Sequence, residues 1–137
     1  RDRVDADHFV RVGVDSLTGF IPSLDGFTLE TPATITAHEL DTELKSGAHL
    51  SLLDVRNRTE HSSGTIADAP QLSAGKVLFH EDQLPEPSNG GIITFCQSGL
   101  RNSVAAAALR RAGHSIIELE GSYAAWTAHT KEPHAVV

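Results

Sequence analysis

Hydrophobic residues in this chain come in short runs separated by turn residues, and the pattern becomes regular from Thr31 onward. Residues 50–55 form a nearly continuous apolar run, which is typical of a strand buried on both faces. The runs at 76–79, 91–95 and 115–119 are also short, and β-branched and aromatic residues, which favour strands, predominate at 91–95. The pattern therefore predicts four short strands after Thr31.

Helical signals lie between these strands. Thr36 and Glu39 have the spacing of a capping box, in which each side chain bonds the backbone N–H of the other residue. Leu40 and Leu44 follow on one face of the same helix, and Gly47 is a natural residue to end it. Further helices are predicted at residues 57–63, 102–112 and 122–129.

The alternation of short apolar strands with helices predicts βαβ units and a parallel sheet. In such sheets the functional site lies beyond the carboxyl ends of the strands. Cys96 directly follows the strand at 91–95 and precedes the helix at 102–112, so we expect this cysteine at that edge of the sheet.

The segment around the cysteine, here called the cysteine loop, has the composition of an anion cradle. It consists of Cys96, Gln97, Ser98, Gly99, Leu100 and Arg101. Unpaired N–H groups at a helix start, together with the helix dipole, stabilise a thiolate and lower its pKa. Gly99 allows the loop N–H groups to converge, and Arg101 adds a positive fork suited to an oxyanion such as the sulfonate of thiosulfate. The loop predicts a nucleophilic Cys96.

Two plainer interpretations of the same residues stay open. A lone cysteine is often a small buried hydrophobe, which would make Cys96 part of the core. An arginine at the start of a helix often forms only a surface ion pair, which would remove Arg101 from substrate binding.

The composition excludes several classes of protein. A formal net charge of −7 argues against nucleic-acid or anionic-membrane partners, which bind patches of Lys and Arg, and no apolar run approaches the roughly 20 residues of a membrane span. The single cysteine cannot form an internal disulfide or a zinc site built on cysteine pairs, and the eight histidines lack metal-binding spacing. We therefore expect no metal. The unpaired thiol favours a cytoplasmic setting.

The motifs on either side of the cysteine resemble those of a rhodanese-like domain. The strand at 50–55 runs into Leu-Asp-Val-Arg, Glu60 follows, and the cysteine loop is preceded by Ile-Thr-Phe. The next helix ends Leu-Arg-Arg-Ala-Gly, and Glu-Gly at 120–121 precedes Trp126. The resemblance spans residues 31–130.

This resemblance implies a five-stranded parallel sheet with helices on both faces. It also implies that Cys96 takes a sulfane sulfur from a small-molecule donor, becomes a persulfide and passes the sulfur to a thiol or cyanide acceptor, without metal or organic cofactor. The backbone N–H groups of residues 97–101 would hold the outer sulfur. Asp54, Arg56 and Glu60 would support the site structurally, with Arg56 and Glu60 paired.

The chain departs from the family pattern at two places. Residues 64–69 read Gly-Thr-Ile-Ala-Asp-Ala where rhodaneses often read Gly-His-Ile-Pro-Gly-Ala. Gly121-Ser122 stands where the family often has a pair of glycines. Neither departure is expected to touch the cysteine loop.

The resemblance also suggests how the chain is organised. Residues 1–30 are expected to be an N-terminal extension with a short strand and turns, residues 31–130 the rhodanese-like domain, and residues 131–137 a C-terminal tail. Residues 8–20 resemble a segment that precedes the terminal rhodanese domain of proteins in which a metallo-β-lactamase-fold hydrolase is fused to it. The chain contains no methionine, so we expect it to be a piece of a longer protein of that kind.

Two other functions fit the loop less well. Cysteine phosphatases place five residues between cysteine and arginine, whereas four separate Cys96 from Arg101, which makes the loop tighter. A non-catalytic module, or a persulfide relay serving a fused domain, is the alternative, although rhodanese domains that only bind partners usually lose the cysteine. Thiosulfate and glutathione persulfide both stay candidate donors, because Gln97, Ser98 and Leu100 carry no charge that would discriminate between them.

Overall fold

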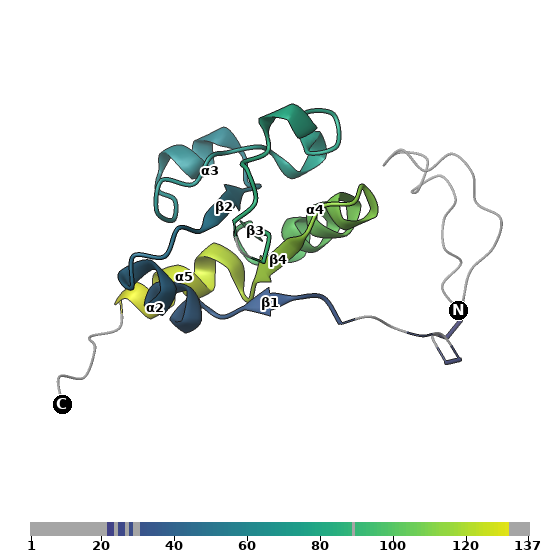
Figure 1. The fold of residues 1–137 in the computed structure, drawn as a ribbon, viewed down its shortest axis with the longest axis horizontal. Coiled ribbons are helices and arrows are strands. Elements are labelled where there is room, and N and C mark those ends of the chain that lie inside the picture. The colour runs from purple at the N-terminus through teal and green to yellow at the C-terminus, as the bar shows by residue number, and fades with distance from the viewer. Residues whose placement is uncertain (1–21, 24, 27, 29–30, 89, 132–137) are drawn as a thin grey trace. The chain divides into compact units, whose positions relative to one another are not determined.

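The computed structural model describes residues 22, 23, 25, 26, 28, 31–88 and 90–131 (Figure 1). The backbone divides into two units, Arg1–Glu30 and Thr31–Val137. In the first unit, the Ser23 hydroxyl donates to the Asp25 carboxylate at 2.6 Å, within a turn. The short strand expected near the N-terminus and residues 132–137 of the predicted tail fall outside the described residues, whereas Lys131, its first residue, is helical.

The second unit is built on a parallel sheet with the strand order β1-β4-β3-β2. Its strands are β1 Thr34–Ile35, β2 Ser51–Asp54, β3 Ile92–Phe95 and β4 Ile116–Leu119. The described residues thus contain four strands, and the expectation of five is wrong for this part of the chain. All three pairs of neighbouring strands are parallel, as the alternation of strands and helices predicts.

Residues 70–74 occupy the edge of the sheet beside β2 without forming a strand. The Asp54 N–H donates to the Pro70 carbonyl, and the Leu72 N–H donates back to the Asp54 carbonyl, at 2.9 and 3.0 Å. Only Asp54 and Gln71 form a bridge of the parallel type. Pro70 has no N–H to donate, so a regular ladder cannot extend through it.

The strand predicted at 76–79 is also wrong. This segment continues the 3-10 helix η1, Ala74–Lys76, into a turn in which the Phe79 N–H donates to the Lys76 carbonyl. Val77 is buried, whereas Phe79 is 82% exposed. Of the three hydrophobic residues in this segment, Val77 lies in the core and Leu78 and Phe79 are exposed, which their order in the sequence does not reveal.

In the part of the chain that the structure describes, four α-helices surround the sheet, together with a second 3-10 helix, η2, Glu81–Gln83. They are α2 Ala37–Lys45, α3 Arg58–Ser62, α4 Leu100–Arg111 and α5 Ser122–Lys131. The capping box predicted for Thr36 and Glu39 is confirmed, with the Thr36 N–H donating to Glu39 Oε2 at 2.8 Å.

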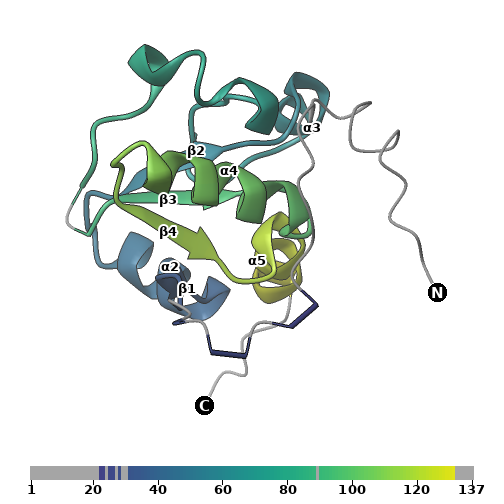
Figure 2. The same cartoon turned by 90° about the vertical axis from the view of Figure 1, so that its right-hand side faces the viewer.

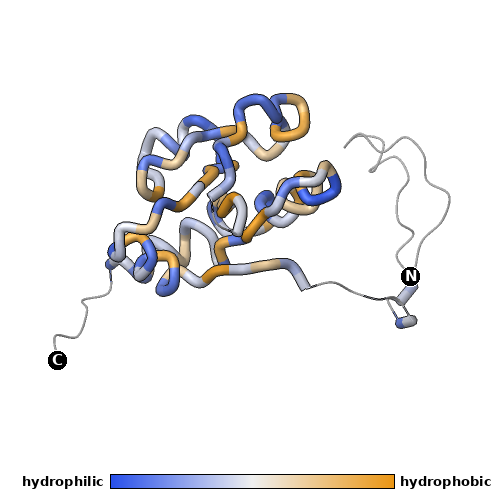
Figure 3. The backbone as a smooth tube through the Cα atoms, viewed as in Figure 1, coloured by the Kyte–Doolittle hydropathy of each residue, from blue (hydrophilic) through white to orange (hydrophobic). Residues whose placement is uncertain are grey.

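Helices cover both faces of the sheet, as expected (Figure 2). On one face, side chains of α4 such as Leu109 pack against Leu53 and Ile92. On the other face, Leu40 of α2 packs with Leu52, and residues of α5 pack against the same cluster. Neighbouring strand residues point to opposite faces, so β2 supplies Leu53 to one cluster and Leu52 to the other, and all four of its residues are buried. Figure 3 shows hydrophobic stretches on the central strands and also on the helices and loops around them.

Candidate active site

The cysteine loop lies at the carboxyl edge of the sheet, between the end of β3 and the start of α4. Cys96 is the first residue after β3 and is almost completely buried. The first turn of α5 holds the loop from the other side, because the N–H groups of Tyr123 and Ala124 donate to the carbonyls of Cys96 and Gln97 at 2.9 Å each. The site is therefore assembled from β3, α4 and α5.

Gly99 is the residue that turns the loop into the helix. Its φ of 114° is a left-handed conformation that residues with a Cβ avoid. Gly99 caps α4, so the helix begins at Leu100, two residues before the predicted start. Leu100 and Arg101 consequently belong to the first helical turn, beside the thiol.

The thiol of Cys96 receives a hydrogen bond from the loop itself. The N–H of Gly99 donates to Cys96 Sγ at 3.0 Å. Burial alone raises the pKa of this thiol, yet hydrogen bonds from the N–H groups of Asn102, Gly99 and Ser98 bring the pKa below its ordinary value. The start of a twelve-residue helix therefore stabilises a thiolate at this position.

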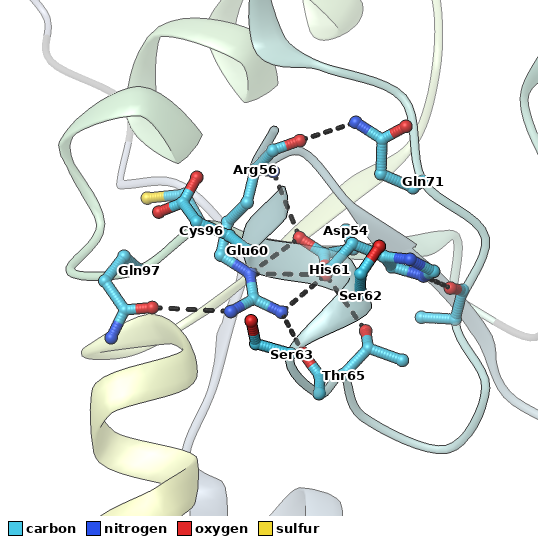
Figure 4. A network of polar contacts seen from close by, with 12 residues as sticks. Asp54, Arg56, Glu60, His61, Ser62, Ser63, Thr65, Gln71, Cys96 and Gln97 are labelled. Atoms are coloured by element: carbon cyan, nitrogen blue, oxygen red, sulfur yellow. Dashed lines mark hydrogen bonds and ion pairs between the residues drawn. The ribbon is translucent and has the colours of Figure 1, made fainter. Parts of the chain in front are cut away.

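Arg56 and Asp54 form a buried ion pair behind the loop (Figure 4). Arg56 Nη2 lies 2.7 Å from Asp54 Oδ2, and Arg56 Nε lies 3.0 Å from Asp54 Oδ1, so the contact is bidentate. The guanidinium also donates to the Gly64 carbonyl, lies 3.4 Å from Gln97 Oε1 and sits over the Tyr123 ring, 4.0 Å from its centroid. One buried cation thus connects β2, the cysteine loop and α5.

Glu60 pairs with Arg101. Its two carboxylate oxygens accept from Arg101 Nη1 and Nη2 at 2.7 Å each, and the pair holds the pKa of Glu60 down at about 2. The expected pairing of Arg56 with Glu60 is therefore wrong. Residues four apart face each other only within one helix, and Arg56 precedes α3, which begins at Arg58. The fork of Arg101, expected to face an oxyanion, is engaged by this carboxylate.

Ser122 is a site residue that the sequence analysis set aside. Its side chain is fully buried, and its Oγ accepts from the Cys96 N–H at 3.2 Å and lies 3.9 Å from Cys96 Sγ. The expectation that this departure from the family pattern stays away from the cysteine loop is thus wrong. Ser122 has a φ of 53°, which explains why glycine is common at this position. Ser122 lies at the start of the last helix, which follows β4 at the same edge of the sheet. This position is the sequence feature that could have indicated its proximity to Cys96.

The departure from the family pattern at residues 64–69 contacts the ion pair between Asp54 and Arg56. Within residues 64–69, the Thr65 hydroxyl donates to Asp54 Oδ2 at 2.9 Å and Ile66 is fully buried. Ala67 and Asp68 take left-handed φ values of 45° and 55°, in a turn where the family often places proline and glycine. This turn therefore supports the Asp54 carboxylate through the Thr65 hydroxyl.

The described residues contain no cluster of three or more His, Cys, Asp or Glu side chains that could hold a metal ion. Among the same residues, no helix is both long and apolar enough to cross a membrane.

The fold and the site define an α/β domain that presents a cysteine at the carboxyl edge of a parallel sheet, in a loop that leads into a helix. A sequence model of the rhodanese-like domain family matches residues 36–129. The chain therefore belongs to the rhodanese-like domain family.

Known proteins resemble this chain over most of its length. It is 33% identical over 95 residues to the probable adenylyltransferase/sulfurtransferase MoeZ of Mycobacterium tuberculosis, a match that covers 69% of this chain but only 24% of that protein. It is 28% identical over 96 residues to a sulfurtransferase of Allochromatium vinosum, covering 69% of this chain and 88% of that protein. The crystal structure of the Alr3790 protein from Anabaena is similar, with a TM-score of 0.62 and 27% identity over 75% of this chain and 83% of that one.

Proposed function

We propose that this domain is a sulfurtransferase that moves a sulfane sulfur from a small-molecule donor to a thiol or cyanide acceptor through a persulfide on Cys96. The observation that carries the proposal is the environment of the thiol. Its sulfur accepts the N–H of Gly99 at 3.0 Å at the start of α4, and hydrogen bonds hold its pKa below the ordinary value. The relatives named sulfurtransferases support the same reaction class.

The transfer proceeds in two displacements at sulfur. In the first, the Cys96 thiolate attacks the outer sulfur of the donor, a new S–S bond forms, and the donor's own bond to that sulfur breaks. The leaving group departs with the bonding electron pair, as sulfite from thiosulfate or as a thiolate from a persulfide. In the second, the acceptor takes the outer sulfur and Cys96 leaves as a thiolate.

The loop residues have distinct roles in this scheme. The N–H groups of residues 97–101 stabilise the negative charge on the outer sulfur, because helix-start N–H groups have no intrahelical partner. Gly99 shapes the turn, and Ser122 adds a hydroxyl close to the sulfur. Asp54, Arg56 and Glu60 fix the loop and the first turn of α4 in place. The reaction needs no metal or organic cofactor.

The setting of the domain follows from its resemblance to larger fusions. We infer that residues 1–30 form the tail of a preceding metallo-β-lactamase-fold domain, and that the parent protein acts in the cytoplasm on thiols or their persulfides. A domain of that kind would generate or consume the same sulfur species that Cys96 carries.

The test is the intact mass of the protein after exposure to thiosulfate and, separately, to glutathione persulfide. A gain of about one sulfur atom, reversed by reductant, is expected with at least one donor. The Cys96→Ser variant is the control and should gain nothing. If the natural chain gains no sulfur from either donor, the proposal fails and the fold serves a binding role.

A further inference from the structure

Two arginines, one within the cysteine loop and one packed against it, each form an ion pair with a carboxylate. Arg56 is buried against Asp54 in a bidentate contact, and Arg101 is held by both oxygens of Glu60. The other side chains between Cys96 and Arg101 are uncharged. The surroundings of the thiol therefore combine two positive with two negative charges.

Glu60 is fixed by two kinds of contact. Its Oε2 accepts from the Asn57 N–H at 3.0 Å, which completes the capping box of α3, and also from Arg101 Nη1 at 2.7 Å. The bond to Arg101 first, and the bond to the Asn57 backbone among lesser causes, keep the pKa of Glu60 at about 2. The carboxylate is thus charged at any working pH and is held in place by the helix that it caps.

Arg101 is within electrostatic reach of the sulfur. Its pKa is raised chiefly by the hydrogen bonds to Glu60, and the charge of Cys96 adds to this effect. Arg101 stands in the first turn of α4, directly after Gly99 and Leu100, at the helix end whose N–H groups face the thiol. A free guanidinium there would attract the thiosulfate dianion, whereas one engaged by a carboxylate attracts it much less.

Candidate donors differ in the charge of the group next to the transferred sulfur. Thiosulfate is a dianion whose sulfonate is bonded directly to that sulfur. The persulfide of a small thiol carries at most one negative charge at its reacting end. On the basis of the proposed sulfur transfer, we propose that Glu60 determines donor specificity by occupying the Arg101 fork, so that the site favours small-thiol persulfides over thiosulfate.

Both reactions balance at the same sulfur. With a persulfide, Cys96–S⁻ and R–S–SH give Cys96–S–SH and R–S⁻, so the thiolate leaves with the electron pair of the broken S–S bond. With thiosulfate, Cys96–S⁻ and S–SO₃²⁻ give Cys96–S–S⁻ and SO₃²⁻. Only the second reaction requires the site to accept a leaving group that carries two charges.

The decisive variant is Glu60→Gln. Glutamine at this position of a capping box still accepts the Asn57 N–H, so α3 keeps its cap while the charge that engages Arg101 is lost. We expect kcat/KM for thiosulfate to rise about fivefold, the size of effect typical of a partly exposed ion pair. Because Glu60 also helps to hold the first turn of α4, the decisive readout is the ratio of the two donors' kcat/KM values, which should shift towards thiosulfate by about fivefold.

A matched control is Glu39→Gln. Glu39 holds the equivalent position in the capping box of α2, so this variant makes the same chemical change in another helix. It should alter neither donor's kcat/KM. In Glu60→Gln combined with Arg101→Gln, the gain with thiosulfate should disappear, because the freed fork is its cause.

Measurements on the natural chain keep the inference independent of how the variants fold. Its kcat/KM with glutathione persulfide should exceed that with thiosulfate by at least about fivefold. Equal or better use of thiosulfate would overturn the inference, as would an unchanged thiosulfate value in a folded Glu60→Gln protein. If the natural chain accepts sulfur from neither donor, the sulfur-transfer proposal itself fails instead.

Discussion

At the scale of single residues, the reactivity of Cys96 depends on groups that are distant in the sequence. The N–H of Gly99 comes from its own loop, but the hydroxyl of Ser122 comes from the start of the last helix. At 3.2 Å that hydroxyl accepts the Cys96 N–H, which leaves its own hydrogen free to point at the sulfur. Ser122 therefore acts as a positioning residue for the thiolate.

Replacing Ser122 separates this hydroxyl from the backbone conformation. Both Ser122→Gly and Ser122→Ala should raise the pKa of Cys96, because a hydrogen bond to the thiolate is lost, and so lower the thiolate fraction at neutral pH. The pH profile of Cys96 alkylation measures this change. The exposed Ser103→Ala should leave the profile unaltered. A profile unchanged in both Ser122 variants would contradict the role of the hydroxyl.

The two Ser122 variants should differ in stability. The φ of 53° suits glycine but strains alanine, so Ser122→Ala should be less stable than Ser122→Gly by about 1 kcal/mol in urea unfolding.

At the scale of elements, the Asp54–Arg56 pair connects the end of β2 with the cysteine loop and α5. Asp54 is fully buried and is bonded by Arg56 and Thr65. A buried cation that loses its partner is costly, because no water can replace the carboxylate. The strength of this connection can be measured by neutralising Asp54.

Asp54→Asn should lower the free energy of unfolding by about 3 kcal/mol, since it leaves Arg56 buried without a matching charge. Urea denaturation followed by circular dichroism measures the effect. Glu81→Gln, which removes the exposed partner of His114, should cost at most about 1 kcal/mol. Similar losses of unfolding free energy in the two variants would show that the buried pair contributes no more to stability than the exposed pair.

The same elements show how far the sequence predicts the structure. The buried strands and the capped helix after Thr36 follow from local patterns, and they are found within a residue or two of their expected places. β1 has only two residues, too few for any periodicity, and the turn after η1 resembles a strand in its letters alone. Local sequence patterns cannot show which apolar run pairs with a neighbouring strand.

For the site, the sequence predicts the features that depend on the cysteine loop alone. It does not predict the contacts between side chains that come from different elements. The thiol at a helix start was predicted because its electrostatics are local. The partners of Arg56 and Arg101 were not, since they depend on where α3 begins and how it faces α4. Ser122 was missed because 26 residues separate it from Cys96.

At the scale of the whole molecule, the Glu60–Arg101 pair links the pH dependence of stability to the site. The folded pKa of Glu60, about 2, lies below its ordinary value of 4.5. The unfolded chain therefore binds a proton first as pH falls. The stability due to this carboxylate is complete above pH 4.5 and is lost as pH falls through 2.

Glu60→Gln should remove this contribution. The natural chain should exceed the variant in unfolding free energy at neutral pH, and the difference should shrink as pH is lowered from 4.5 towards 2. Chemical unfolding at a series of pH values measures it, with Glu39→Gln as the comparison. A difference that is constant across this range would show that the charge of Glu60 does not contribute.

The hydrogen bonds from α5 to the cysteine loop link the position of this helix to the groups around the thiol. The carbonyls of Cys96 and Gln97 are held by the N–H groups of Tyr123 and Ala124, and in a trans peptide the N–H points opposite to its carbonyl. A displacement of α5 would therefore rotate the peptide plane between Gln97 and Ser98, and the N–H of Ser98 in that plane bonds the sulfur of Cys96. A change in the position of α5 would thus alter the hydrogen bonding of the Cys96 thiolate, and with it the pKa of the thiol.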